Sequence, residues 1–336
     1  MPFLFTVAVL LATMTDSHKN VASATLLSLE SPNDLKPKGR IVYLVRHAES
    51  RYNAAMKSRS LSRLIGERDH GLSENGRSQC EHLCQKILVA AEHGDPDALA
   101  IISRKVTYSS PLSRAVCTAY LSFPPQKQPS SLSQTANPVV VLPDAREHCM
   151  MRLFARDSEG TAKSALQEKV EKELAEEQGT VVIDTTHVSR EQWWTIGESQ
   201  RSINDRLAQL LGFLYSKAPP IDGKKSPDEA AVVLVTHSRV IRAAMRSFHE
   251  GKASQEQSDA RKILAVGGEG KDVTRNLVEN CAVLRLRLVQ RRDSLGLGND
   301  RAMPPEQPSS LGTTIKEPRT AIRISDAEFL FGTGFK

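Results

Sequence analysis

Residues 41–50 read IVYLVRHAES, and this stretch decides the fold class. Its first five residues are apolar and mostly β-branched, which is typical of a strand buried on both faces of a sheet. Two basic residues, Arg46 and His47, follow the strand at once. Because ligands of open α/β sheets bind beyond the carboxyl ends of the strands, the stretch predicts a buried strand with a binding site at its end.

The same pattern recurs farther along the chain. Residues 106–109 and 232–235 are short strands, and the stretches that follow them contain Arg114 and His237. Residues 281–289 alternate between apolar and polar side chains, which predicts a half-exposed strand that is antiparallel or at an edge. Helices are expected at residues 74–91, 111–121, 198–215 and 240–248. The alternation of strands and helices predicts an α/β three-layer sandwich, with a mostly parallel central sheet and helices on both faces.

Composition and local bias set the expected domain organisation. The chain has 336 residues, 40% of them hydrophobic, which is enough for a sizeable core, and its five cysteines are too few for a disulfide scaffold. We expect one domain over residues 40–292, with a Pro- and Ser-rich surface insertion at about 124–138. Residues 1–39 are expected to form a leader and residues 293–336 a flexible tail.

The leader contains an apolar run at residues 3–12 (FLFTVAVLLA). Its length is about half of the roughly 20 residues that span a bilayer. Small residues at 22–24 resemble a signal cleavage site. However, no Lys or Arg precedes the run, and Asp16, His18 and Lys19 lie in an over-long segment between the run and that site. We therefore expect a cytoplasmic protein, with the secretory pathway as the alternative. Membrane contact is expected only if this segment is retained as a signal or anchor.

The net charge of +6 points to an anionic partner: nucleic acid, a membrane surface or a small anion. Basic residues are interspersed with acidic ones, and no basic run carries aromatic residues, so nucleic-acid binding is not expected. If the strands are parallel neighbours, Arg46, His47, Arg114 and His237 meet at one edge of the sheet. Each of them alone is more typical of a solvated loop, a surface charge or a structural histidine. Together they favour a small dense anion such as phosphate.

Six motifs follow one another along residues 40–290. They are residues 46–53 (RHAESRYN), 69–79 (DHGLSENGRSQ), 109–119 (SSPLSRAVCTA), 142–147 (LPDARE), Gly197-Glu198-Ser199 with Arg206, and 235–237 (VTH) with Ile241-Arg242. In type and order they resemble the histidine phosphatase (phosphoglycerate mutase-like) superfamily, branch 1. Two positions depart from the family pattern, because Ala48 and Ser238 replace the glycines that usually follow the two histidines. These changes affect the shape of the pocket and remove no catalytic group.

The resemblance implies a metal-independent phosphomonoesterase that acts through a phosphohistidine intermediate on His47. The resemblance implies that the enzyme uses no cofactor and no metal. The implied substrate is a small phosphorylated metabolite or a phosphoprotein. Arg46, Arg114, His237 and Asn53 correspond to the residues that bind the phosphate. Positive charges beside His47 disfavour the imidazolium form and keep the ring neutral.

The general acid is expected to be Glu147, from its position in the fourth motif and from the need for a carboxyl group near the leaving oxygen. Asp144, three residues earlier, and Glu49 are the alternative carboxylates.

Two other functions remain as alternatives to a phosphatase. Phosphoglycerate mutases carry a long segment with tyrosine and glycine after the acidic residue, whereas residues 148–153 here read HCMMRL. A catalytically inactive phosphate-binding or scaffold protein needs no nucleophile, yet His47 is retained with both arginines and His237. A phosphatase is therefore the favoured function.

Overall fold

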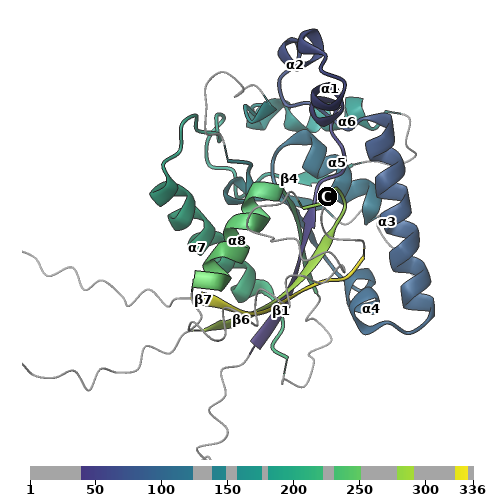
Figure 1. Ribbon diagram of the computed structural model, residues 1–336, viewed down its shortest axis with the longest axis vertical. Helices are drawn as coiled ribbons and strands as arrows, with labels where there is room; N and C mark the ends of the chain where they lie inside the picture. Colours follow the sequence, from purple (N-terminus) through teal and green to yellow (C-terminus); the bar gives the residue numbers. More distant parts are fainter. Residues whose placement is uncertain are drawn as a thin grey trace, which may run out of the picture. The chain divides into compact units, whose positions relative to one another are not determined.

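The computed structural model describes residues 39–123, 138–148, 157–175, 181–221, 231–250, 278–290 and 322–331. These residues contain a seven-stranded sheet with helices on both faces (Figure 1). Residues 1–38 of the expected leader and 124–137 of the expected insertion lie outside the described residues. No helix in the described part of the chain is long and apolar enough to cross a membrane.

The sheet has the strand order β4-β3-β2-β5-β1-β6-β7. The five strands from β4 to β1 are parallel, while β6 is antiparallel to both β1 and β7. The expected three-layer α/β sandwich with a mostly parallel sheet is thus confirmed. The strands are β1 (Gly39–Arg46), β2 (Thr107–Ser109), β3 (Val139–Val141), β4 (Ile183–Asp184), β5 (Val232–Thr236), β6 (Val283–Gln290) and β7 (Ile322–Phe329).

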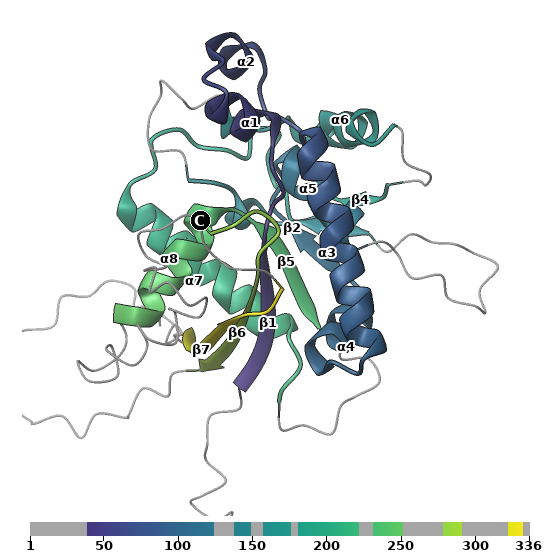
Figure 2. The same cartoon turned by 45° about the vertical axis from the view of Figure 1, so that its right-hand side comes forward.

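Strand β1 has an apolar core on each side, which explains its continuous apolar run. Val42 and Leu44 pack in the cluster with α7 and α8, whereas Tyr43 and Val45 pack in the cluster with α3, α4, α5 and α6. Figure 2 shows these two groups of helices on opposite sides of β1. Side chains alternate between the two faces of a strand, so both faces need apolar residues. The helices are α1 (Arg51–Lys57), α2 (Leu61–Gly66), α3 (Glu74–Glu92), α4 (Pro96–Ile102), α5 (Ser113–Ser122), α6 (Leu166–Glu173), α7 (Gln200–Lys217) and α8 (Ser238–Glu250).

A close contact fixes the start of α3 against the loop that follows β1. Ser73 caps the helix by accepting a hydrogen bond from the Gly76 N–H at 3.0 Å. A Cβ atom at Gly76 would lie 2.1 Å from the carbonyl oxygen of Glu49, so only glycine fits this backbone approach. The helix therefore supports the segment that carries His47.

Strand β6 decides between two expected alternatives, and β7 corrects one expectation. Of the alternatives for β6, antiparallel or at an edge, the antiparallel one is confirmed, and β7 pairs along its outer side. The expectation of a flexible tail is wrong for Ile322–Phe329, which form β7. The residues that β7 buries, Ile324 and Ala327, lie three apart, because a register shift at Arg287/Leu288 interrupts the ladder. A spacing of three does not follow the period of two by which a strand is recognised in sequence.

We expect Ile324→Ala to lower the free energy of unfolding by about 2–4 kcal/mol, since a buried Ile loses its packing against the sheet. The neighbouring Arg323 is exposed, and Arg323→Ala is expected to change stability by less than about 0.5 kcal/mol. Urea denaturation of both variants measures the difference. Equal stability of the two variants would show that β7 adds no packing energy to the domain.

Candidate active site

The site lies where β1, β5 and β2 end side by side. The strand register places Arg46 opposite Thr236, and Ser109 opposite Val235. The residues that follow these strands are therefore brought to one edge of the sheet. The His47 N–H donates to the Thr236 carbonyl at 2.9 Å, and the Ser110 N–H donates to the Val235 carbonyl at 2.9 Å.

The rings of His47 and His237 are buried, with their centroids 4.9 Å apart. His47 Nδ1 lies 2.6 Å from the carbonyl oxygen of Ala48. A carbonyl only accepts hydrogen bonds, so Nδ1 carries the proton and Nε2 keeps its lone pair. Burial, followed by the charges of Arg114 and Arg46, lowers the pKa of His47 well below its usual value. The ring is thus neutral, and its nucleophilic nitrogen is Nε2.

The second histidine is held by a hydroxyl group. His237 Nε2 lies 2.8 Å from Ser110 Oγ, while its Nδ1 is buried and has no hydrogen-bond partner in the described part of the chain. Burial, followed by the charge of Arg114, lowers the pKa of His237. When the Ser110 hydroxyl donates to Nε2 of this neutral ring, Nδ1 carries the proton. His237 then has one N–H free to donate to a bound anion.

Two guanidinium groups complete the positive part of the site. Arg114 is 1% exposed, and its Nη1 donates to the carbonyl and carboxylate oxygens of Asp157 at 2.9 and 3.0 Å. Arg46 donates to the Val278 carbonyl, and burial lowers its pKa to about 10, so it remains charged at neutral pH. The Nε atoms of both arginines are buried and have no partner among the described residues. Buried charges need compensation, and a bound anion would supply it.

The three candidate carboxylates lie in different surroundings. The charges of Arg239, Arg114 and Arg46 act on Glu147, so this carboxyl lies near both arginines of the site. Burial outweighs these charges and raises its pKa. Glu147 Oε1 also accepts a hydrogen bond from the His148 N–H at 2.9 Å.

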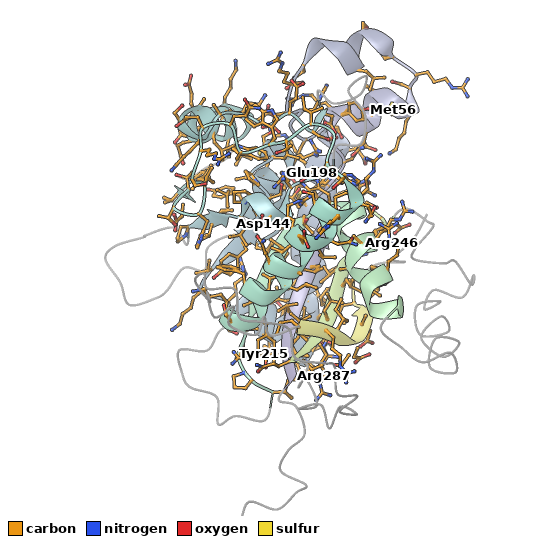
Figure 3. The ribbon with its side chains drawn as sticks, turned by 90° about the vertical axis from the view of Figure 1, so that its left-hand side faces the viewer. Met56, Asp144, Glu198, Tyr215, Arg246 and Arg287 are labelled. Atoms are coloured by element: carbon orange, nitrogen blue, oxygen red, sulfur yellow. The ribbon has the colours of Figure 1, made fainter. Side chains whose placement is uncertain are left out.

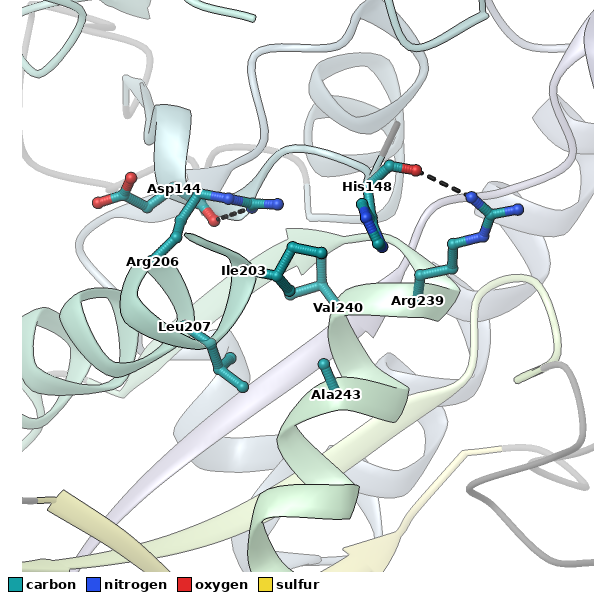
Figure 4. A pocket seen from close by; sticks show the side chains of 8 residues that line it. All are labelled: Asp144, His148, Ile203, Arg206, Leu207, Arg239, Val240 and Ala243. Atoms are coloured by element: carbon teal, nitrogen blue, oxygen red, sulfur yellow. Dashed lines mark hydrogen bonds between the residues drawn. The ribbon is translucent and has the colours of Figure 1, made fainter. Parts of the chain in front are cut away.

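Asp144 belongs to a separate cluster beside α7. The charges that act on it come from Arg146, Arg206 and Glu198. Asp144 and Glu198 are labelled in Figure 3, and Asp144 lines a cavity between α7 and α8 (Figure 4). Glu49 is an ion-pair partner of Lys57 and accepts hydrogen bonds from the side chains of Ser73 and Asn75 at 3.0 and 3.1 Å. Of the three carboxylates, Glu147 is therefore the one that lies near the site arginines Arg46 and Arg114.

Asn53, which is expected to contact phosphate, also takes part in the N-terminal cap of α1. Its Oδ1 accepts a hydrogen bond from the Ser50 N–H at 3.3 Å, while Ser50 Oγ accepts one from the Asn53 N–H at 3.1 Å. This reciprocal pair caps α1. The Nδ2 group of Asn53 makes no hydrogen bond within the described ranges and remains a donor.

The two positions where glycine is replaced have ordinary backbone geometry. Neither Ala48 nor Ser238 is among the described residues with a positive φ angle. The Ala48 N–H donates to Thr118 Oγ1 at 3.0 Å. Ser238 Oγ accepts from the Val278 N–H at 3.2 Å, and the carbonyl of that same residue accepts from Arg46. Ser238 is therefore linked to the guanidinium of Arg46 through the backbone of Val278.

Sequence reasoning missed the segment that holds the nucleophile from the other side. Asn280 Nδ2 donates to the His47 carbonyl at 3.0 Å, and the Cys281 N–H donates to the Arg46 carbonyl at 3.0 Å. Asp157, which pairs with Arg114, was also missed. For Asn280 and Cys281, the sequence indicates only that they stand at the start of the strand predicted at 281–289. No sequence motif includes Asp157.

The chain belongs to the histidine phosphatase superfamily (branch 1), whose family model matches residues 42–263. Among solved structures, a mycobacterial glucosyl-3-phosphoglycerate phosphatase in complex with VO3 is 20% identical over 76% of this chain and 93% of its own, with a TM-score of 0.37. A phosphoglycerate mutase from Bacillus anthracis is 14% identical over 75% of this chain and 88% of its own, with a TM-score of 0.37. No curated protein matches the chain. The family assignment rests on the sequence match.

We expect Ser238→Ala to weaken the binding of inorganic phosphate about three- to tenfold, because Val278 loses one of the two bonds that hold it beneath Arg46. In an Arg46→Ala background the same change should have little effect, which titration calorimetry on the four proteins measures. Ser216→Ala, at the end of α7, is the matched control. An equal loss with and without Arg46 would show that Ser238 does not act through that side chain.

Proposed function

We propose that the protein is a metal-independent phosphomonoesterase that acts through a phosphohistidine intermediate at His47. The observation that carries this proposal is the bond from His47 Nδ1 to the Ala48 carbonyl, in a ring whose pKa is lowered. It leaves the Nε2 lone pair available beside two buried arginines. The substrate class is a phosphorylated small molecule or a phosphoprotein.

In the first step, the Nε2 lone pair of His47 attacks phosphorus and the bond between phosphorus and the ester oxygen breaks. Arg46, Arg114 and the Nδ1–H of His237 hold the equatorial oxygens, whose negative charge they stabilise in the transition state. The leaving oxygen takes the electron pair of the broken bond and a proton from Glu147. The raised pKa of Glu147 suits it to carry this proton.

In the second step, Glu147 is a carboxylate and acts as a base. It accepts a proton from water while the water oxygen attacks phosphorus, and the phosphorus–nitrogen bond breaks. The electron pair of that bond returns to Nε2 of His47, and inorganic phosphate leaves. Glu147 is protonated again, so the residues regain their starting states.

The nucleophile is tested by His47→Ala. We expect phosphatase activity to fall by at least about 10³-fold, because the variant lacks the Nε2 lone pair that forms the covalent intermediate. Quenching the wild-type protein with alkaline SDS during turnover of a labelled substrate should trap a phosphoenzyme that is stable in base and labile in acid, and the variant should lack it. His82→Ala, an exposed position on α3, is the matched control.

EDTA should leave the rate of the wild-type protein unchanged. Inhibition by EDTA, or hydrolysis that survives His47→Ala, would contradict the proposed mechanism. A labelled phosphoenzyme that passes its phosphate to a second alcohol rather than to water would indicate a mutase.

The general acid is tested by Glu147→Gln against leaving groups of different basicity. We expect hydrolysis of an alkyl phosphate to fall by about 10²-fold or more, and that of 2,4-dinitrophenyl phosphate by less than about fivefold, because only the alkoxide needs a proton. Asp144→Asn is the matched control and should spare both substrates.

The pH dependence gives a second measurement of the same residue. Burial raises the pKa of Glu147 above its ordinary 4.5, so the acid form persists at higher pH. The rate with the alkyl ester should therefore fall as the pH rises through the raised value, and this fall should be absent in Glu147→Gln. Equal losses of both substrates in that variant would exclude Glu147 as the acid.

A further inference from the structure

The carboxylate of Asp157 lies against the guanidinium of Arg114 and has no role in the proposed mechanism. Arg114 Nη1 donates to the carbonyl oxygen of Asp157 at 2.9 Å and to its carboxylate oxygen Oδ1 at 3.0 Å. His70 Nδ1 lies 3.3 Å from the same Oδ1 atom. Asp157 is 9% exposed and Arg114 is 1% exposed, so solvent ions screen this pair little.

A second carboxylate, that of Asp69, fixes the two segments that form the ion pair. It accepts hydrogen bonds from the N–H and Oγ of Ser113 at 2.9 and 3.0 Å, and from the N–H and Oγ1 of Thr161 at 3.2 and 2.8 Å. Ser113 directly precedes Arg114. Thr161 follows Asp157 by four positions. Asp69 therefore joins the segment of the guanidinium to the segment of its partner.

The ion pair changes the net charge of the site. His47 and His237 are neutral, since burial and the nearby arginines lower the pKa of both rings. Arg46 and Arg114 are the two guanidinium groups of the site, and Asp157 compensates the charge of the second. A bound dianion therefore meets one uncompensated positive charge rather than two.

The carboxylate of Asp157 has opposite effects on the empty and on the occupied site. In the empty site it stabilises Arg114, because a buried charge without a partner is costly. Arg114 Nε is buried and has no partner among the described residues, so it is the donor that an anion can still use. The anion and the carboxylate then share one guanidinium group. The repulsion between them grows in proportion to the charge of the anion.

We propose that Asp157 is a specificity-determining residue that lowers the affinity of the site for doubly charged anions and so speeds the release of inorganic phosphate. The inference rests on the proposed function, since the release of phosphate completes hydrolysis. An enzyme that passes phosphate to a second alcohol has to retain the group, whereas a phosphatase has to lose it. The charge of Asp157 favours the second outcome.

The experiment uses titration calorimetry to measure how Asp157→Asn changes the binding of two tetrahedral anions. Sulfate carries two charges and methanesulfonate carries one. The amide keeps an oxygen that accepts from Arg114 and removes only the charge. We expect methanesulfonate to bind about threefold more tightly and sulfate about tenfold, because the lost repulsion doubles with the charge of the anion and the fold-change is squared. The inhibition constant of inorganic phosphate in the hydrolysis assay should fall as well.

The stability of the same variant should change in the opposite direction. Without an anion, Asp157→Asn should melt at a lower temperature than the wild type, since Arg114 loses its charged partner. Lower stability combined with tighter binding is a result that mere damage to the site does not produce. All proteins are purified in sulfate, which replaces the lost partner, and are then dialysed. Asp157→Ser provides the same comparison if the first variant does not fold.

Asp97→Asn is the matched control, since Asp97 stands in the first turn of α4 and pairs with Arg285 of β6 at 3.1 Å. Its affinity for both anions should equal that of the wild type. Weaker or unchanged binding of sulfate in Asp157→Asn, or equal gains for the two anions, would overturn the inference alone when hydrolysis by the wild type depends on His47. A wild-type protein that binds neither sulfate nor phosphate, or that shows no His47-dependent hydrolysis, would instead overturn the proposed function.

Discussion

The burial of two guanidinium groups beside two neutral histidines is the constraint on which the site depends. Arg46 and Arg114 repel one another, and both disfavour protonation of His47 and His237. Removing such charges from water is costly unless they are paired, and among the described residues Asp157 alone pairs with one of them. The parallel strands supply rigid backbone that holds these like charges together. The same arrangement that is unfavourable when empty is complementary to a doubly charged anion.

The fold was predictable as far as it depends on local patterns. The buried strand at residues 41–45, the helix over residues 74–91 and the basic residues that follow three strands are all visible in the sequence. Parallel pairing then brings His47 and His237 together without further information. Strand β7 was not predictable, because a register shift that depends on its partner sets which of its residues are buried.

The sequence predicts which residue types form the site, but it does not determine which of the candidate carboxylates lies beside the site arginines. Asp144 and Glu147 are three positions apart, yet they lie among different sets of arginines. Which set each carboxylate meets depends on the short 3-10 helix Pro143–Ala145 and on packing against α7. The support for Arg46 and His47 from Val278 and Asn280 is likewise long-range, since more than two hundred residues separate the partners. Local sequence carries no information on such contacts.

The added strand β7 also changes how the sheet ends. Along β7 the exposed residues are Arg323, Asp326 and Glu328, all of them charged, while the opposite edge is β4, which is only two residues long. An open strand edge is a template for pairing with another chain, and charges or extreme shortness discourage such pairing. As far as the described residues extend, neither border of the sheet offers a long apolar strand, so growth of the sheet by association of copies is disfavoured at both ends.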